Sequence, residues 1–265
     1  MNKLLCIVTT GRSGSSLLAN LASSINFNLS DQLFGSNFTN IKGHFEDLNI
    51  MSKNDHFLGR INKKMWDTIE LTDVQNNLFR DKYKTQIINY LSRVIDSKKN
   101  LLLKEPRISK LFHLYQEIFH ELDCEIFFIY LYRSPMLYSK STFNAYRNVD
   151  LKLGTKIWFY HNYNILNNFR ETDNILKLNF SKFIQDMPFY CSEISKFVEE
   201  KIDQNKFDEY RSKFYDEKLV NFKDDEKTNI KHIDEFYSFI ENLNFDEFVE
   251  MKQKLSNWNL EKILK

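Results

Sequence analysis

The sequence predicts an α/β protein, in which a parallel sheet carries helices on both of its faces. Four apolar runs have the length of buried strands, and segments with helical spacing of apolar residues lie between them. Strands that alternate with helices in this way form parallel sheets covered on both faces. A turn rich in glycine and serine, TTGRSGSS, joins the first run to the first helical segment, an arrangement typical of phosphate-binding loops.

The predicted strands and helices follow one another along the chain. The strands are expected at residues 4–9, 101–103 (LLL), 126–132 (IFFIYLY) and 175–180 (ILKLNF), because each run is predominantly apolar. The helices are expected at residues 15–24, 48–58, 83–95, 109–122, 135–147 and 156–169. Asp47 suits the N-terminal cap of the second helix, and Pro135 suits the first turn of the fifth.

The sequence becomes charged and helical from about residue 199. Apolar residues then recur three to five positions apart, at Ile233, Phe236, Ile240, Leu243 and Phe248. This spacing predicts an amphipathic helix pair packed on the domain, with a lid over the site or a homodimer contact as the alternatives. We therefore expect a single domain, residues 1–265, with an α/β core at 1–198 and a helical C-terminal part at 199–265.

Composition and charge exclude several classes of protein. The 265 residues, 42% of them hydrophobic, suffice for one large core. A net charge of +1 leaves no overall electrostatic footprint for nucleic acid, so no nucleic-acid partner is expected. No run approaches the roughly 18 apolar residues of a membrane span. The apolar run at residues 4–8 is too short for a signal peptide. These features predict a soluble cytoplasmic protein, and the richness in Asn, Lys, Ile and Phe indicates an AT-rich microbial genome, as of a bacterium.

The three cysteines, Cys6, Cys124 and Cys191, are widely spaced and form no pattern of metal ligands with the histidines. Buried free thiols in a reducing compartment are expected.

Polar residues follow three of the predicted strands. They are Gly11-Arg12-Ser13, Lys104-Glu105-Pro106-Arg107 and Arg133-Ser134-Pro135. The carboxyl ends of parallel strands lie at one edge of a sheet, and ligands of such sheets bind there. We therefore expect these three segments to meet at one site.

The glycine-rich loop predicts an anion site. Backbone N–H groups from Arg12 to Ser16 can converge on an anion, and the hydroxyls of Ser13, Ser15 and Ser16 add donors. A loop for nucleoside triphosphates would read G-x-x-x-x-G-K-[ST], whereas Gly11 and Gly14 are three apart and no Lys follows. No Asp that could hold a metal follows the third strand either. The loop therefore predicts a phosphate-type group neutralised by protein cations, with no metal; an ordinary strand-to-helix turn is the alternative.

A second anion site is predicted at Arg133 and Ser141. Arg133 leaves the end of a strand, and Ser141 lies eight residues later on the helix that follows. A forked, permanently charged guanidinium and a hydroxyl together can hold a second phosphate. A solvated surface arginine is the alternative.

The two anion motifs together resemble those of the PAPS-dependent sulfotransferases, whose donor is 3′-phosphoadenosine 5′-phosphosulfate, and most closely those of the bacterial and tyrosyl-protein branches. Further stretches match in order over about residues 4–190: GHFED (43–47), LLLKEPR (101–107), IWFYHNY (157–163) and LNFSKFIQDMP (178–188). The resemblance implies a fold like that of P-loop nucleoside kinases. It also implies that the loop residues Gly11, Arg12, Ser13, Gly14, Ser15 and Ser16 bind PAPS together with Arg133 and Ser141. Arg12 stands where the cytosolic members have Lys, as it does in the tyrosyl-protein and several bacterial members. Glu105 replaces the usual Asp, and Phe180 replaces a common Tyr.

The resemblance further implies a catalytic carboxylate in GHFED, and Glu46 is the expected base. Neighbours in an extended segment point to opposite sides, so Asp47 would not share its role, whereas His44 lies on the same side and is the alternative. Arg12 and Lys104 are the expected catalytic cations. Arg107 either orders the site or pairs with Glu105.

The acceptor, the alternative functions and the remaining histidines complete the predictions from the sequence. The acceptor is expected to be a carbohydrate first, then a small metabolite, then a protein tyrosine. A small-molecule kinase and a non-catalytic nucleotide-binding protein are the alternative functions. The remaining histidines are expected to have structural roles; they are His56, His113, His120, His161 and His232.

Overall fold

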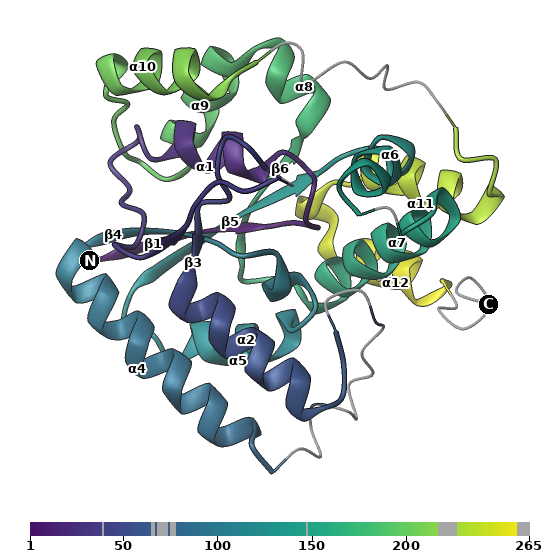
Figure 1. The fold of residues 1–265 in the computed structure, drawn as a ribbon, viewed down its shortest axis with the longest axis horizontal. Helices are drawn as coiled ribbons and strands as arrows, with labels where there is room; N and C mark the ends of the chain where they lie inside the picture. Colours follow the sequence, from purple (N-terminus) through teal and green to yellow (C-terminus); the bar gives the residue numbers. More distant parts are fainter. Residues whose placement is uncertain are drawn as a thin grey trace.

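A four-stranded parallel sheet forms the centre of the computed structural model (Figure 1). The structure describes residues 1–38, 40–64, 67, 74, 78–146, 148–216 and 227–258. The end of the helix expected at 135–147, and residues 217–226 and 259–265 of the C-terminal part, lie outside these. The strands are β1 (Lys3–Val8), β4 (Asn100–Lys104), β5 (Glu125–Tyr132) and β6 (Asn174–Asn179), in the spatial order β4-β1-β5-β6. The predicted α/β class with a parallel sheet is confirmed.

Alternate residues of the strands enter two separate cores, one on each face of the sheet. In β1, Leu4 and Cys6 enter one core, and Leu5 and Ile7 enter the other. This two-sided burial explains why the strands read as continuous apolar runs rather than as an alternation of polar and apolar residues.

Helices cover both faces (Figure 1). One face carries α1 (Ser15–Ala22), α8 (Phe180–Gln185), α9 (Met187–Phe197) and α10 (Gln204–Phe214). The other carries α2 (Leu48–Arg60), α4 (Arg80–Lys98), α5 (Phe112–His120), α6 (Pro135–Ala145), α7 (Leu151–Asn168), α11 (Lys231–Glu241) and α12 (Phe248–Ser256). Short 3-10 helices lie at Pro106–Ser109 and Phe245–Glu247. Among the described residues, no helix has the length and apolarity needed to cross a bilayer.

Two local expectations need correction. The helix expected at 109–122 is α5, which begins only at Phe112 and ends at His120, because a 3-10 turn occupies Pro106–Ser109. The long loop after α1 contains a hairpin that the sequence reading missed, in which β2 (Leu33–Phe34) pairs antiparallel with β3 (Glu46–Asp47). Strands of two residues are too short to produce a periodic pattern.

The C-terminal part contributes to both faces. The paired amphipathic helices, α11 and α12, bury Ile233, Phe236 and Ile240 against the core that contains α7, as the spacing predicted. By contrast, α10 buries Phe207 in the opposite core, beside α1. The end of α10 thereby reaches the connection between β2 and β3, where Phe214 packs against Phe45.

Candidate active site

The three polar segments that follow β1, β4 and β5 lie together at the carboxyl edge of the sheet. They line an open cavity of about 630 Å³. Of the residues expected to form the site, the cavity is lined by Gly11, Arg12, Gly14, Ser15, Ser16, Glu46, Lys104, Arg133 and Ser141. The structure thus brings together in one place residues that are up to 130 positions apart, from Gly11 to Ser141.

Two residues with positive φ shape the loop after β1. Gly14, with a φ of 83°, caps α1, and Arg12 has a φ of 66°. The backbone N–H groups of Leu17 and Leu18 bond to the carbonyl of Gly14, so the N–H groups that precede them stand at the helix end, where the dipole is positive. This geometry suits an anion.

The serine side chains of the loop differ in their environment. The Ser13 hydroxyl is fully buried and lies 2.5 Å from the Thr10 hydroxyl, and Ser13 is the one expected donor that does not line the cavity. Ser16 lines the cavity, and its hydroxyl donates to the carbonyl of His44. The loop is therefore tied to the segment that carries Glu46.

The base and the cation expected from the sequence form a buried ion pair. Nζ of Lys104 lies 2.8 Å from Oε1 of Glu46, and it also donates to the carbonyl of His44 at 3.0 Å. Both side chains are less than a tenth exposed. Burial alone would raise the pKa of Glu46, but Lys104, a hydrogen bond with His44 and the charge of Arg107 lower it to about 2. Glu46 is therefore a carboxylate at neutral pH.

His44, the alternative base, lies beside Glu46 in a fixed orientation. Its Nδ1 is 3.7 Å from Oε1 of Glu46, and its Nε2 is 3.0 Å from Oδ1 of Asn37. The ring packs against Phe34 at a centroid distance of 4.6 Å. Asp47, by contrast, faces away and caps α2, accepting from the N–H of Ile50, as the alternation of an extended segment predicts.

Arg107 is held by carboxylates on two sides. Nη1 bonds to Oε1 of the fully buried Glu105 at 2.6 Å, and Nε bonds to Asp55. The same Nη1 is 3.7 Å from Oε2 of Glu46. Both roles expected of Arg107 therefore coexist, since pairing with Glu105 leaves it beside the second oxygen of Glu46. Asn54 completes the cage around Glu105 through a hydrogen bond to Oε2.

Arg133 lies on the opposite side of the loop, with its side chain nearly buried. Its Nη1 donates to the carbonyl of Arg12 at 3.3 Å, and its guanidinium lies 5.2 Å from the centre of the Phe180 ring. Its own carbonyl accepts from the indole N–H of Trp158. The backbone of Arg133 and its guanidinium are thus both fixed, which is the condition for oriented binding of a phosphate.

Several residues of the site carried no signal in the sequence reading. Phe180 was noted only as a departure from a family pattern, yet its ring contacts the loop at Gly14. Phe214, the last residue of α10, and Tyr215 and Asp216, which follow it, line the cavity from about 200 residues downstream of the loop. Sequence patterns do not reveal such contacts, because they depend on how α10 packs against α1.

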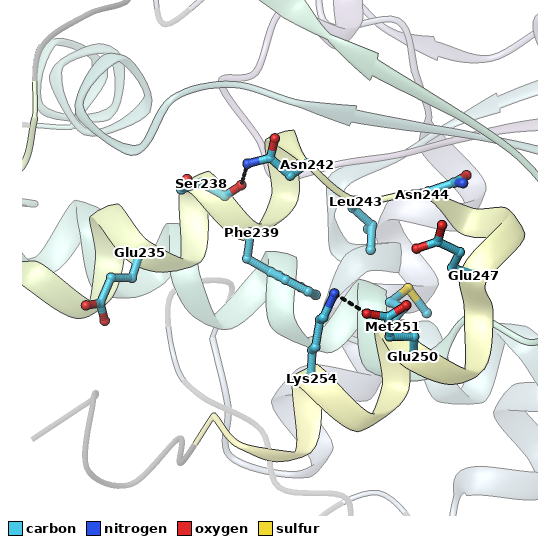
Figure 2. Close-up of a pocket in the computed structure, with 10 residues that line it drawn as sticks. All are labelled: Glu235, Ser238, Phe239, Asn242, Leu243, Asn244, Glu247, Glu250, Met251 and Lys254. Atoms are coloured by element: carbon cyan, nitrogen blue, oxygen red, sulfur yellow. Dashed lines mark hydrogen bonds and ion pairs between the residues drawn. The ribbon is translucent and has the colours of Figure 1, made fainter.

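A second cavity, of about 340 Å³, lies between α11 and α12 (Figure 2). Its lining includes Phe239, Leu243 and Met251, together with an exposed ion pair between Lys254 and Glu250. It shares no lining residue with the cavity at the loop. No group of three metal-ligating side chains occurs within the described part of the chain, at this cavity or elsewhere. The convergence of charged residues therefore favours the loop cavity as the functional site.

Comparison with known proteins identifies the fold. The sulfotransferase domain from the Synechococcus PCC 7002 olefin synthase superposes with a TM-score of 0.54 at 16% identity, over 97% of this chain and 96% of that one. The sulfotransferase domain from the curacin biosynthetic pathway gives 0.52 at 12% identity, over 97% of this chain and 98% of that one. No protein-family profile matches the chain. No curated protein matches it in sequence. The chain has a sulfotransferase fold, as the motifs predicted.

Proposed function

We propose that this chain, which has the fold of sulfotransferase domains, transfers a sulfuryl group from PAPS to a hydroxyl or amine of an acceptor. The observation that carries the proposal is the buried ion pair of Glu46 with Lys104 beside the loop after β1. A carboxylate that can take a proton and a cation that can stabilise negative charge lie at one point. Transfer of a sulfuryl group to an alcohol requires both there.

The charge of the cavity favours a donor with several anionic groups. Five basic side chains line it, Arg12, Lys42, Lys104, Arg107 and Arg133, against two acidic ones, Glu46 and Asp216. This excess of positive charge contrasts with the net charge of +1 for the whole chain. Among the described residues, the lining of the cavity includes no group of three metal-ligating side chains, so we expect the cations of the protein to neutralise the ligand directly.

The residues divide between the two phosphate-type groups of PAPS. The N–H groups at the start of α1, with Ser15 and Arg12, would hold the phosphosulfate. Arg133 and Ser141, across the loop, would hold the 3′-phosphate. Burial lowers the pKa of Arg12, although Tyr146 and Tyr138 oppose this, and an anion beside Arg12 would offset that burial cost.

The position of each residue in the cavity suggests its role in the transfer. PAPS supplies an activated sulfuryl group, whose bond to the phosphate oxygen breaks as the bond to the acceptor oxygen or nitrogen forms, leaving PAP (3′-phosphoadenosine 5′-phosphate). Glu46 takes the proton of the acceptor. Lys104 and Arg12 stabilise the charge that develops on the departing oxygen. Arg107 holds the second oxygen of Glu46, so the carboxylate stays oriented if Lys104 turns to the ligand.

Thermal-shift measurements with PAP, ATP and Mg-ATP test the proposal. A single-site ligand at 100 times its Kd stabilises a protein by about 2.7 kcal/mol. We expect PAP to raise Tm equally with and without Mg²⁺, and ATP to raise it less. Stabilisation by Mg-ATP alone would replace the proposal with a small-molecule kinase. Stabilisation by PAP without release of PAP from PAPS in the presence of any alcohol would indicate a non-catalytic binding protein.

A further inference from the structure

Apolar side chains from the segments around Glu46, and from the end of α10, line the cavity. Phe34 is the β-sheet partner of Glu46, Phe45 precedes Glu46, and Met51 lies in the first turn of α2. The ring of Phe214, at the end of α10, packs edge-on against Phe45 at a centroid distance of 5.2 Å. All four line the cavity.

Two further apolar residues line the cavity and are open to solvent. Phe38 is 89% exposed and Ile41 is 66% exposed, and both belong to the connection between β2 and β3. Glu46 begins the second strand of the same hairpin. The hairpin therefore presents the expected base and two uncovered apolar side chains to one cavity. A ligand that covered them would gain the free energy of removing apolar surface from water.

Asn37, Asn40 and Lys42 of the same connection already have partners within the protein. Oδ1 of Asn37 accepts from the N–H of Asn40 and contacts His44. The amide of Asn40 donates to the carbonyl of Gly43 and to the hydroxyl of Ser16. The ammonium of Lys42 donates to the carbonyl of Lys213 at 3.0 Å. These polar groups thus hold the shape of the connection and tie it to the loop after β1 and to α10.

This arrangement disfavours a sugar as the acceptor. A sugar ring can stack its C–H face on the ring of Phe38, but its edge carries hydroxyl groups. Those placed against Ile41 or Met51 would lose their hydrogen bonds to water without a replacement. An acceptor with a single hydroxyl and an alkyl or aryl skeleton would place its hydroxyl at Glu46 and its skeleton against the apolar wall.

We propose that the acceptor is an alcohol with an apolar carbon skeleton, and that Phe38 and Ile41 are specificity-determining residues that cover it. The inference rests on the proposed sulfuryl transfer. It replaces the carbohydrate expected from the sequence with a different class of acceptor.

An acceptor panel tests the inference. The full chain is supplied with PAPS and with 1-octanol, 2-naphthol or chitobiose, and release of PAP and the sulfated product are measured. We expect kcat/KM for the two apolar alcohols to exceed that for chitobiose by about tenfold or more. A preference for chitobiose would overturn the inference and leave the sulfuryl transfer intact.

A pair of variants links the preference to the wall. Phe38→Ser should raise KM for 1-octanol by about five- to tenfold with little change in kcat, because the lost contact is the same in the ground and transition states. Phe189→Ser is the matched control, since Phe189 is 53% exposed on α9 and does not line the cavity. An unchanged KM in Phe38→Ser would count against the inference.

Direct binding separates the two proposals. The fluorescence of 2-naphthol, titrated with protein in the presence of PAP, should report binding that weakens in Phe38→Ser and not in Phe189→Ser. Binding without transfer would support the apolar site and count against the sulfotransferase activity. Transfer to chitobiose without binding of 2-naphthol would support the sulfotransferase activity and count against the apolar site.

Discussion

The ring of Phe180 occupies the space that a side chain on residue 14 would need. A Cβ built on Gly14 would lie 2.0 Å from Cε2 of Phe180, closer than any real contact. Gly14 also has a φ of 83°, which side chains other than that of glycine rarely adopt. The same ring lies 5.2 Å from the guanidinium of Arg133. Phe180 therefore joins the two anion motifs that the sequence shows only as separate segments.

Gly14→Ala should damage both the fold and the loop. Strain at positive φ and the clash with Phe180 together should lower the free energy of unfolding by about 2–4 kcal/mol. Phe180→Leu in the same chain should recover part of this loss, because it relieves the clash and leaves the strain. Chemical denaturation of the four proteins of this double-mutant cycle measures the recovery. Strict additivity of the two substitutions would show that the ring and residue 14 do not compete for space.

Glu46→Gln should lower turnover by about 100-fold or more, on the scale of a lost general base, with the Kd for PAP changed little. Single-turnover assays and calorimetry of PAP binding measure the two quantities. Glu117→Gln is the matched control, because Glu117 pairs with Arg80 and does not line the cavity.

The same assays on His44→Gln decide between the two expected bases. Retention of turnover in Glu46→Gln, with loss in His44→Gln, would move the role to the histidine.

The ion pair of Glu46 with Lys104 should make the free energy of unfolding depend on pH in the acidic range. The pKa of Glu46 falls from 4.5 to about 2 on folding, so its contribution is complete above pH 4.5 and is lost as the pH falls through about 2. The stability difference between the wild type and Glu46→Gln should therefore shrink by about 1–2 kcal/mol between pH 6 and pH 3. Urea denaturation across this range measures it. A difference that stays constant would show that Glu46 has the same pKa in the folded and unfolded chain.

Arg133→Lys should weaken PAP binding by about tenfold or more although it keeps the charge, because an ammonium lacks the planar fork that binds phosphate at two points. Arg93→Lys, on the exposed surface of α4, is the control. Calorimetry at two salt concentrations separates the contribution of the charge, which salt screens, from that of the planar guanidinium. An equal affinity for PAP in Arg133→Lys would mean that only net charge is needed at this position.

The sequence predicted the parts of the site that lie next to strand ends. Lys104 and Arg133 could be placed together because the carboxyl ends of parallel strands share one edge, and no other information was needed. Glu46 was placed beside them by resemblance, and the structure shows the reason, which is that the hairpin of β2 and β3 turns Glu46 toward Lys104.

The contacts that the sequence did not reveal depend on packing between distant elements. Phe214 reaches the cavity only because α10 lies beside α1, and Phe180 reaches Gly14 only because β6 ends beside β5. Neither contact has a period or a motif. The exposure of Phe38 is likewise a property of the folded hairpin. From the sequence alone, a phenylalanine would be assigned to the core.

The position of β1 inside the sheet sets the order in which the binding loop can form. Lys3 pairs with Asn100 and with Glu125, so β1 can join the sheet only when residues 97 and 122 positions downstream are available. Contacts of such long range are slow to form, because the chain loses the entropy of closing a large loop before the contacts can stabilise it. On the ribosome, Gly11–Ser16 would be made before β4 and β5, and the loop would acquire its shape only after Tyr132 has emerged. A nascent chain cut before that point should therefore have no affinity for PAP.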